Sequence, residues 1–104
     1  MGSPGSIPAE LGKLGLLEVL NLCRNRLTGS IPVELGELRI LQELHLCQNT
    51  LTGSIPDELG GLGNLKVLNL AENDLTGAIP FSMWKLQGLR VFVVAGNLLK
   101  YLTG

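Results

Sequence analysis

Residues 41–56 read Leu41-Gln42-Glu43-Leu44-His45-Leu46-Cys47-Gln48-Asn49-Thr50-Leu51-Thr52-Gly53-Ser54-Ile55-Pro56. The part from Glu43 to Cys47 alternates polar and apolar residues, which predicts a half-buried strand with Leu44 and Leu46 in the core. The next residues, 56–62, begin with proline, contain glycines and space their leucines by three. This second pattern favours a short 3₁₀ helix.

The same pattern recurs every 24 residues. The residues that keep this period are the isoleucines of the Ile-Pro pairs, Ile7, Ile31, Ile55 and Ile79, the asparagines Asn25, Asn49, Asn73 and Asn97, and the glycines Gly5, Gly29, Gly53 and Gly77. We therefore predict one repeat domain over residues 1–104, with copies at approximately 5–28, 29–52, 53–76 and 77–100. No copy can bury its leucines alone, so the copies must stack.

Stacking explains the column of asparagines. A buried amide can donate hydrogen bonds to backbone carbonyls of the neighbouring turn and accept from its own turn, which predicts a ladder inside the stack. A buried amide left unpaired would cost about 1–3 kcal/mol. We also expect the glycine two residues before each Ile-Pro pair to hold a backbone conformation that other residues avoid.

The composition argues against several classes of function. The 104 residues include 24 leucines and 14 glycines but only four aromatic residues, one histidine and two cysteines, and the net charge is -1. Few side chains are therefore available for cofactor stacking or proton transfer, and no strong field attracts nucleic acid. No apolar run is long enough to span a bilayer, and residues 1–6 lack the pattern of a signal peptide. We expect no enzyme and no cofactor.

The full pattern, Leu-x-x-Leu-x-Leu-x-x-Asn-x-Leu-Thr-Gly-x-Ile-Pro, resembles the plant-specific leucine-rich repeat of receptor-like kinase ectodomains and polygalacturonase-inhibiting proteins. Residues 27–32, 51–56 and 75–80 match its Leu-Thr-Gly-x-Ile-Pro element in full, and the resemblance covers roughly residues 5–100. It implies an α/β repeat fold: a right-handed solenoid with a concave parallel β-sheet and a convex side of 3₁₀ helices and loops. It also implies ligand binding on the concave or lateral face, outside the cell or at its surface.

The chain departs from that family in several respects. It has no secretion signal, no cysteine-paired N-terminal cap and no glycosylation sequon, and its first copy begins at Gly5 without a strand. An excised piece of a longer array, a minimal gene product and an engineered scaffold all fit these departures. Terminal repeats without polar caps expose leucines, so self-association through the ends is an open alternative. In the diverged fourth copy, Lys100 or Tyr101 is expected to cover the last rung.

The outward positions of the strands and the turns after them form columns across neighbouring copies. Arg24 and Arg26 make the first copy basic, Glu72 and Asp74 make the third acidic, and the fourth is apolar. Such a gradient can selectively bind a peptide with opposite charges at its two ends. The alternative is that these charges are scattered over the surface and form no binding patch. The candidate binding residues are Arg24, Arg26, Glu43, His45, Gln48, Asn69, Glu72 and Asp74.

Cys23, His45 and Cys47 cluster on the same predicted face. Three soft ligands suggest zinc or copper, but a fourth ligand and a second shell are missing, so we predict no metal site. A disulfide satisfies the distance range but would strain side chains that point the same way, so we expect free thiols. His45 and Cys47 lack an orienting third group and an oxyanion pocket, which argues against a catalytic pair.

These observations predict non-covalent binding of a protein or peptide. Two alternatives stay open: a glycosidase-inhibitor-like defence protein that uses the same face, and a structural or self-assembling repeat module without a ligand. Trp84 occupies the convex position that Gly12, Gly36 and Gly60 hold in the other copies. We expect it to contribute surface packing rather than recognition.

Overall fold

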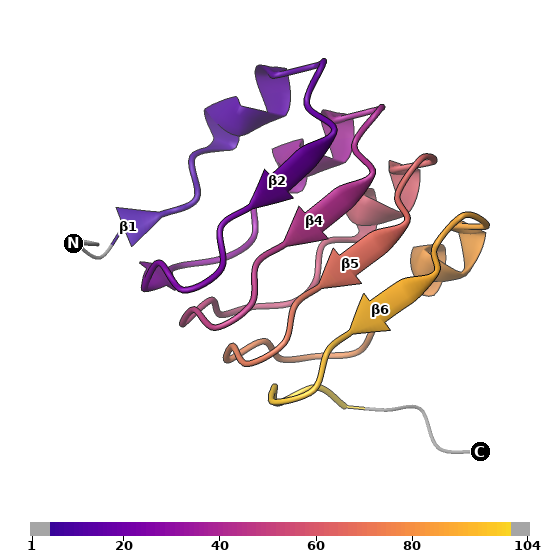
Figure 1. Cartoon of the computed structure of the whole chain (residues 1–104). Coiled ribbons are helices and arrows are strands. Elements are labelled where there is room, and N and C mark those ends of the chain that lie inside the picture. The colour runs from indigo at the N-terminus through magenta and orange to yellow at the C-terminus, as the bar shows by residue number, and fades with distance from the viewer. Residues whose placement is uncertain (1–4, 101–104) are drawn as a thin grey trace.

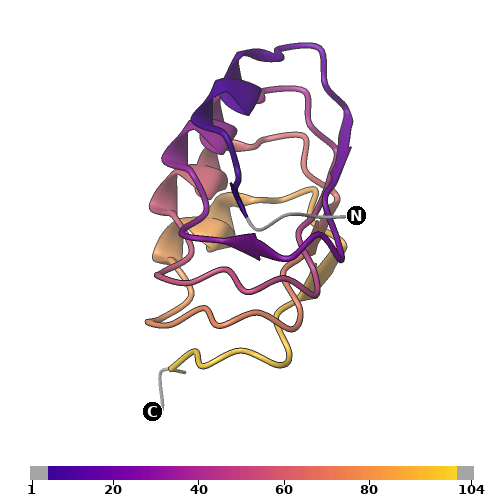
Figure 2. The ribbon, with the colours of Figure 1, turned by 90° about the vertical axis from the view of Figure 1, so that its left-hand side faces the viewer.

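Each 24-residue copy forms one coil of a solenoid, with a strand on one side and a 3₁₀ helix on the other (Figures 1 and 2). The computed structural model describes residues 5–100. One parallel sheet has the order β2-β4-β5-β6, formed by Val19–Asn21, Glu43–His45, Val67–Asn69 and Val91–Val93. The 3₁₀ helices are η1 (Ala9–Lys13), η2 (Val33–Glu37), η3 (Asp57–Gly61) and η4 (Phe81–Lys85). The expected repeat solenoid and its short helices after each proline are confirmed.

The strands pair in the register that the 24-residue period predicts. Glu43 lies between Val19 and Val67, and His45 lies between Asn21 and Asn69. The expected strand from Glu43 to Cys47 is two residues too long, because β4 ends at His45. Hydrogen bonds to the next coil nevertheless continue beyond it, from the Leu46 and Gln48 N–H groups to carbonyls at 2.8 and 2.9 Å.

A second, narrower ladder runs along a neighbouring side of the coils, which the sequence reading did not predict. Gly5–Ser6 (β1) pairs in parallel with Leu27–Thr28 (β3), and single bridges continue the ladder between later coils. Its Thr-Gly-Ser segments carry none of the apolar alternation that indicates a strand. The predicted glycine conformation is confirmed at three of its four positions, since Gly53 has a φ of 78° and Gly29 and Gly77 have 77°. For Gly5 it stays a prediction.

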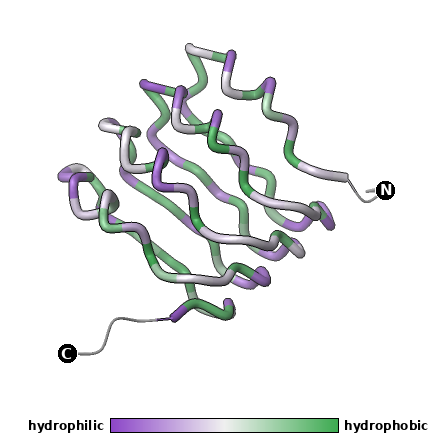
Figure 3. The backbone as a smooth tube through the Cα atoms, turned by 180° about the vertical axis from the view of Figure 1, so that it is seen from behind, coloured by the Kyte–Doolittle hydropathy of each residue, from purple (hydrophilic) through white to green (hydrophobic). Residues whose placement is uncertain are grey.

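The leucines of successive coils fill the space between the sheet and the 3₁₀ helices. Hydrophobic stretches recur at matching places along the coils (Figure 3). The leucines of the second and third coils are almost completely buried, whereas Leu14 and Leu16 of the first are 50% and 88% exposed. Burial of these side chains therefore comes from neighbouring coils. Within residues 5–100, no helix is long and apolar enough to cross a membrane.

The predicted asparagine ladder is present, with one correction to its direction. The Asn73 amide donates to the carbonyls of Leu46 in the preceding coil and Leu70 in its own coil, at 3.0 and 3.2 Å. Its oxygen accepts from the Leu51 N–H of the preceding coil at 3.1 Å, not from its own turn as expected. Each rung thus bridges two coils through both ends of the amide. Asn49 and Asn97 repeat this arrangement.

The first rung differs from the others. Asn25 is exposed, and within residues 5–100 its amide donates only to the Cys23 carbonyl of its own turn, at 3.1 Å. At the other end of the stack, Lys100 is exposed and pairs with Ala78 through its backbone. Coverage of the last rung by its side chain stays a prediction. Tyr101, the alternative, lies outside the described residues.

Asn73→Ala is expected to lower the free energy of unfolding by about 1–3 kcal/mol, because it leaves the buried Leu51 N–H without an acceptor. It also removes one of the two amide donors to the Leu46 carbonyl, which keeps only its hydrogen bond from Asn49. Asn25→Ala is the matched control, and its loss should stay within about 0.5 kcal/mol because the residue is exposed. Urea denaturation of both variants measures the difference. Equal losses of unfolding free energy in the two variants would show that the stabilisation from a rung does not depend on its burial.

Candidate functional site

The outward side of the sheet carries a small polar group at its centre. His45 on β4 lies with its Nε2 atom 2.9 Å from Oε1 of Glu43 on the same strand, and both residues are half-buried. Asn69 on β5 lies beside His45 in the register, and its side-chain oxygen accepts from the Ala71 N–H at 3.1 Å. The structure thus brings three of the predicted binding residues together, with the Asn69 oxygen already engaged by its own chain.

A row of exposed side chains borders this group where the strands end. Arg24, Gln48 and Glu72 hold left-handed backbone conformations, with φ of 63°, 54° and 59°. Such conformations cost about 1–2 kcal/mol in residues other than glycine. The backbone N–H of each residue donates to a carbonyl of the next coil at 2.8–3.0 Å, which offsets part of that cost. The row therefore follows directly from the way the coils stack.

The charges along this row change sign. The Arg24 Nε atom donates to the side-chain oxygen of Gln48 in the next coil. Glu72 follows one coil further on, and Arg26 and Asp74 lie exposed two residues beyond Arg24 and Glu72. Neighbouring strands are about 4.8 Å apart, so the basic and acidic ends are separated by about 10 Å. The basic side chains of the first coil and the acidic side chains of the third thus occupy the same columns, two coils apart.

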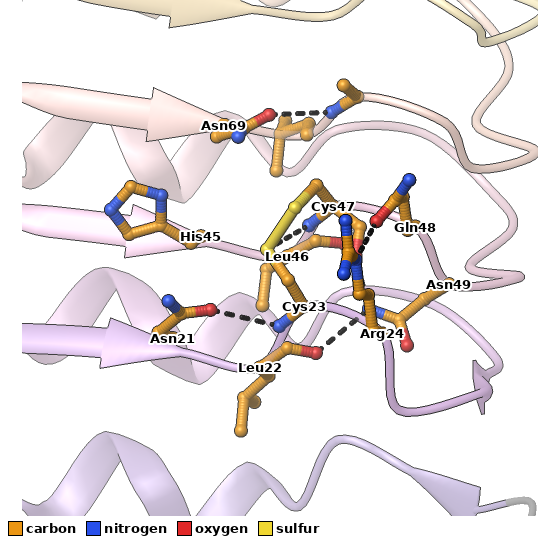
Figure 4. The surroundings of a disulfide bond; sticks show 12 residues. Asn21, Leu22, Cys23, Arg24, His45, Leu46, Cys47, Gln48, Asn49 and Asn69 are labelled. Carbon is orange, nitrogen blue, oxygen red and sulfur yellow. Dashed lines mark hydrogen bonds between the residues drawn. A yellow bond between two sulfur atoms is a disulfide. The ribbon is translucent and has the colours of Figure 1, made fainter.

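Cys23 and Cys47 form a disulfide, so the expectation of free thiols is wrong (Figure 4). The two Cα atoms are 4.6 Å apart, within the range that disulfides require. This proximity follows from the register, because Asn21 pairs with His45 and each cysteine lies two residues beyond the end of its strand. That the two side chains point the same way did not prevent the bond.

The disulfide also bears on the metal and catalytic hypotheses. The two cysteine sulfur atoms are bonded to each other, so neither is available as a thiolate ligand or nucleophile. His45 lies against Glu43 rather than against a thiol. Among residues 5–100, no group of three His, Cys, Asp or Glu residues could hold a metal ion.

One surface feature escaped sequence reasoning. An apolar pocket of about 330 Å³ opens at the last coil. It is lined by Ile79, Met83, Trp84, Leu86, Leu89, Arg90 and Phe92. Trp84 and Phe81 on η4 are both 79% exposed. The replacement of a periodic glycine by Trp84 was the signal that could have revealed this feature.

Comparisons with known proteins agree with this architecture. The family model described as "Leucine rich repeat" matches residues 15–75 and 39–99. The ectodomain of the receptor kinase GASSHO1/SCHENGEN3 from Arabidopsis thaliana, solved with CASPARIAN STRIP INTEGRITY FACTOR 2, is 44% identical with a TM-score of 0.91, over 92% of this chain and 12% of that chain. No curated protein sequence matched.

Two further solved structures are similar. The complex of the Arabidopsis receptor kinase HAESA with the peptide hormone IDA and the co-receptor SERK1 gives 40% identity and a TM-score of 0.87, over 89% of this chain and 16% of that chain. The BIR3–SERK2 complex from Arabidopsis thaliana gives 39% and 0.89, over 93% and 52%. This chain therefore spans between about an eighth and about half of the chains it matches.

Removing the disulfide is expected to lower the free energy of unfolding by about 3 kcal/mol, because the bond closes a loop of 24 residues in the unfolded chain. Guanidinium denaturation with and without a reducing agent measures this loss. The double variant Cys23→Ala and Cys47→Ala is the control, and the reducing agent should not change its stability. A wild-type chain that is equally stable with and without reductant would contradict the expectation.

Proposed function

Because the chain belongs to the leucine-rich repeat family, we propose that it is a non-covalent binding module whose protein or peptide ligand lies across the outward side of the sheet. The observation that carries this proposal is the row of Arg24, Gln48 and Glu72. Their side chains are exposed, and each stands on a strained, left-handed turn position. Backbone strain of this kind clusters at functional sites.

The fourth coil gives an internal comparison for that row. Gly96 occupies the equivalent position with a φ of 77°, so glycine meets the backbone requirement there without a side chain. Arginine, glutamine and glutamate in the other coils therefore bring side chains that the turn does not need. Non-glycine residues at positive φ are uncommon, and three at one repeated position favour a role for the side chains.

The spacing of the charges suggests the kind of ligand. An extended peptide advances about 3.3 Å per residue, so about three residues cover the 10 Å between the two ends of the row. Its acidic residue would lie over Arg24 and Arg26, and its basic residue over Glu72 and Asp74. His45, half-buried beside the row, offers a hydrogen-bonding group along the path.

The related structures support a binding role of this class. The HAESA structure contains a peptide hormone and a co-receptor, and the GASSHO1/SCHENGEN3 structure contains a bound factor. Those complexes involve chains much longer than this one. For this chain we therefore propose a ligand-binding surface, without carrying over the identity of any ligand.

A display library of random twelve-residue peptides tests the proposal. The immobilised chain is expected to enrich peptides with an acidic and a basic residue about three positions apart. Arg24→Glu combined with Arg26→Glu should then weaken the best peptide about tenfold, which corresponds to 1.4 kcal/mol, because attraction becomes repulsion. Fluorescence anisotropy with the labelled peptide measures the affinity.

Glu37→Lys changes an exposed charge on η2, away from the sheet, and is the matched control that should leave affinity unchanged. Failure to enrich charged peptides, or equal affinities for all three chains, would overturn the proposed face. Inhibition of a polygalacturonase by the chain, lost in the double arginine variant, would instead support the inhibitor alternative.

A further inference from the structure

The 3₁₀ helices of successive coils approach each other most closely at a repeated glycine. A Cβ atom added to Gly36 in η2 would lie 2.6 Å from the carbonyl oxygen of Glu58 in η3. At Gly12 and Gly60 an added Cβ would likewise overlap Glu34 and Ser82 of the following coil. At all three junctions, a side chain at this position requires the next helix to shift.

The fourth coil places Trp84 at that same position. Trp84 is 79% exposed, so its indole stands free at the end of the stack. Met83 and Leu86 beside it are 5% and 6% exposed, whereas Leu35 and Leu38 at the equivalent positions of the second coil are completely buried. The last coil therefore keeps its core largely covered and adds an exposed side chain that earlier coils lack at this position.

Both ends of the described stack carry accessible apolar groups. The first coil exposes Leu14, and the last opens the apolar pocket beside Leu89. Glu18, Gln42 and Arg90 occupy equivalent positions in their coils. The Gln42 side chain donates to the Glu18 carboxylate of the preceding coil at 3.5 Å. A second copy stacked in the same register would place its own Glu18 beside Arg90, which is an attractive pair.

We propose that Trp84 is a steric stop that prevents a second copy of this chain from stacking onto the last coil in the register of the internal junctions. By the 24-residue period, the incoming copy would bring its Glu10 against position 84, as Glu34 meets Gly12 and Glu58 meets Gly36. The Trp84 Cβ atom alone obstructs that approach, and the indole blocks it further. Open, complementary ends otherwise add head to tail without closing.

Four chains test the proposal by light scattering after size exclusion, at several protein concentrations. The wild-type chain and Trp84→Ala are expected to keep a constant mass near 11.1 kDa, because both retain the Cβ atom. Trp84→Gly restores the residue of the other three coils, and its mass should rise with concentration. Adding Glu18→Arg to Trp84→Gly should reduce that rise, because it places like charges at the junction.

A glycine at position 84 is compatible with the helix, since Gly12, Gly36 and Gly60 already stand at this place in η1 to η3. Circular dichroism checks that each variant keeps the fold. A folded Trp84→Gly chain that stays monomeric would overturn the proposal.

A second readout does not depend on any variant. Trp84 is the only tryptophan of the chain, so its fluorescence maximum reports burial of this end. The wild-type maximum is expected to stay constant as concentration rises. A blue shift accompanied by an increase in mass would show that copies associate over Trp84, and would overturn the proposal.

Discussion

Every feature of this molecule depends on the fact that a single coil cannot bury its own leucines. A coil of 24 residues contains one three-residue strand and one five-residue 3₁₀ helix, and its apolar side chains are covered only by the coils on either side. The asparagine amides add a directional constraint, because each buried rung bonds to two coils at once. Together these interactions hold successive coils in one register.

That register also decides which side chains face a ligand. It aligns the strands so that Glu43, His45 and Asn69 come together on the outward side of the sheet. It provides the hydrogen bonds that hold Arg24 and Glu72 in left-handed conformations. The proposed binding row therefore results from coil stacking. Its backbone conformation is repeated from coil to coil, whereas its side chains differ.

The two ends of the stack show what happens where the constraint is incomplete. The first coil has exposed leucines and an exposed asparagine, and it contacts another described coil on one side only. The last coil has an open apolar pocket and Trp84 at a position where close packing requires glycine. Glycine at this position permits close stacking within the chain, and its replacement by Trp84 creates the proposed steric stop at the last coil.

The sequence by itself determined the period, the order of strand and 3₁₀ helix in each coil, and the buried positions. Each of these follows from patterns that lie within 24 residues, such as the alternation around Leu44 and the proline before each helix. The sequence also identified the columns of outward side chains, because a constant period places equivalent residues side by side. Even the asparagine ladder was predictable in outline, since a buried amide must be paired.

Only the tertiary structure decided features that depend on distances between coils. The Cys23–Cys47 bond forms because the register brings two Cα atoms to 4.6 Å, whereas the direction of the side chains alone argued against it. The amide oxygen of Asn73 accepts from the preceding coil because that N–H, and not one of its own turn, comes within reach. The close approach at Gly36 is likewise a contact between helices. Such contacts join residues about one period apart. A sequence pattern gives the number of residues between them, but not the distance in space between neighbouring coils.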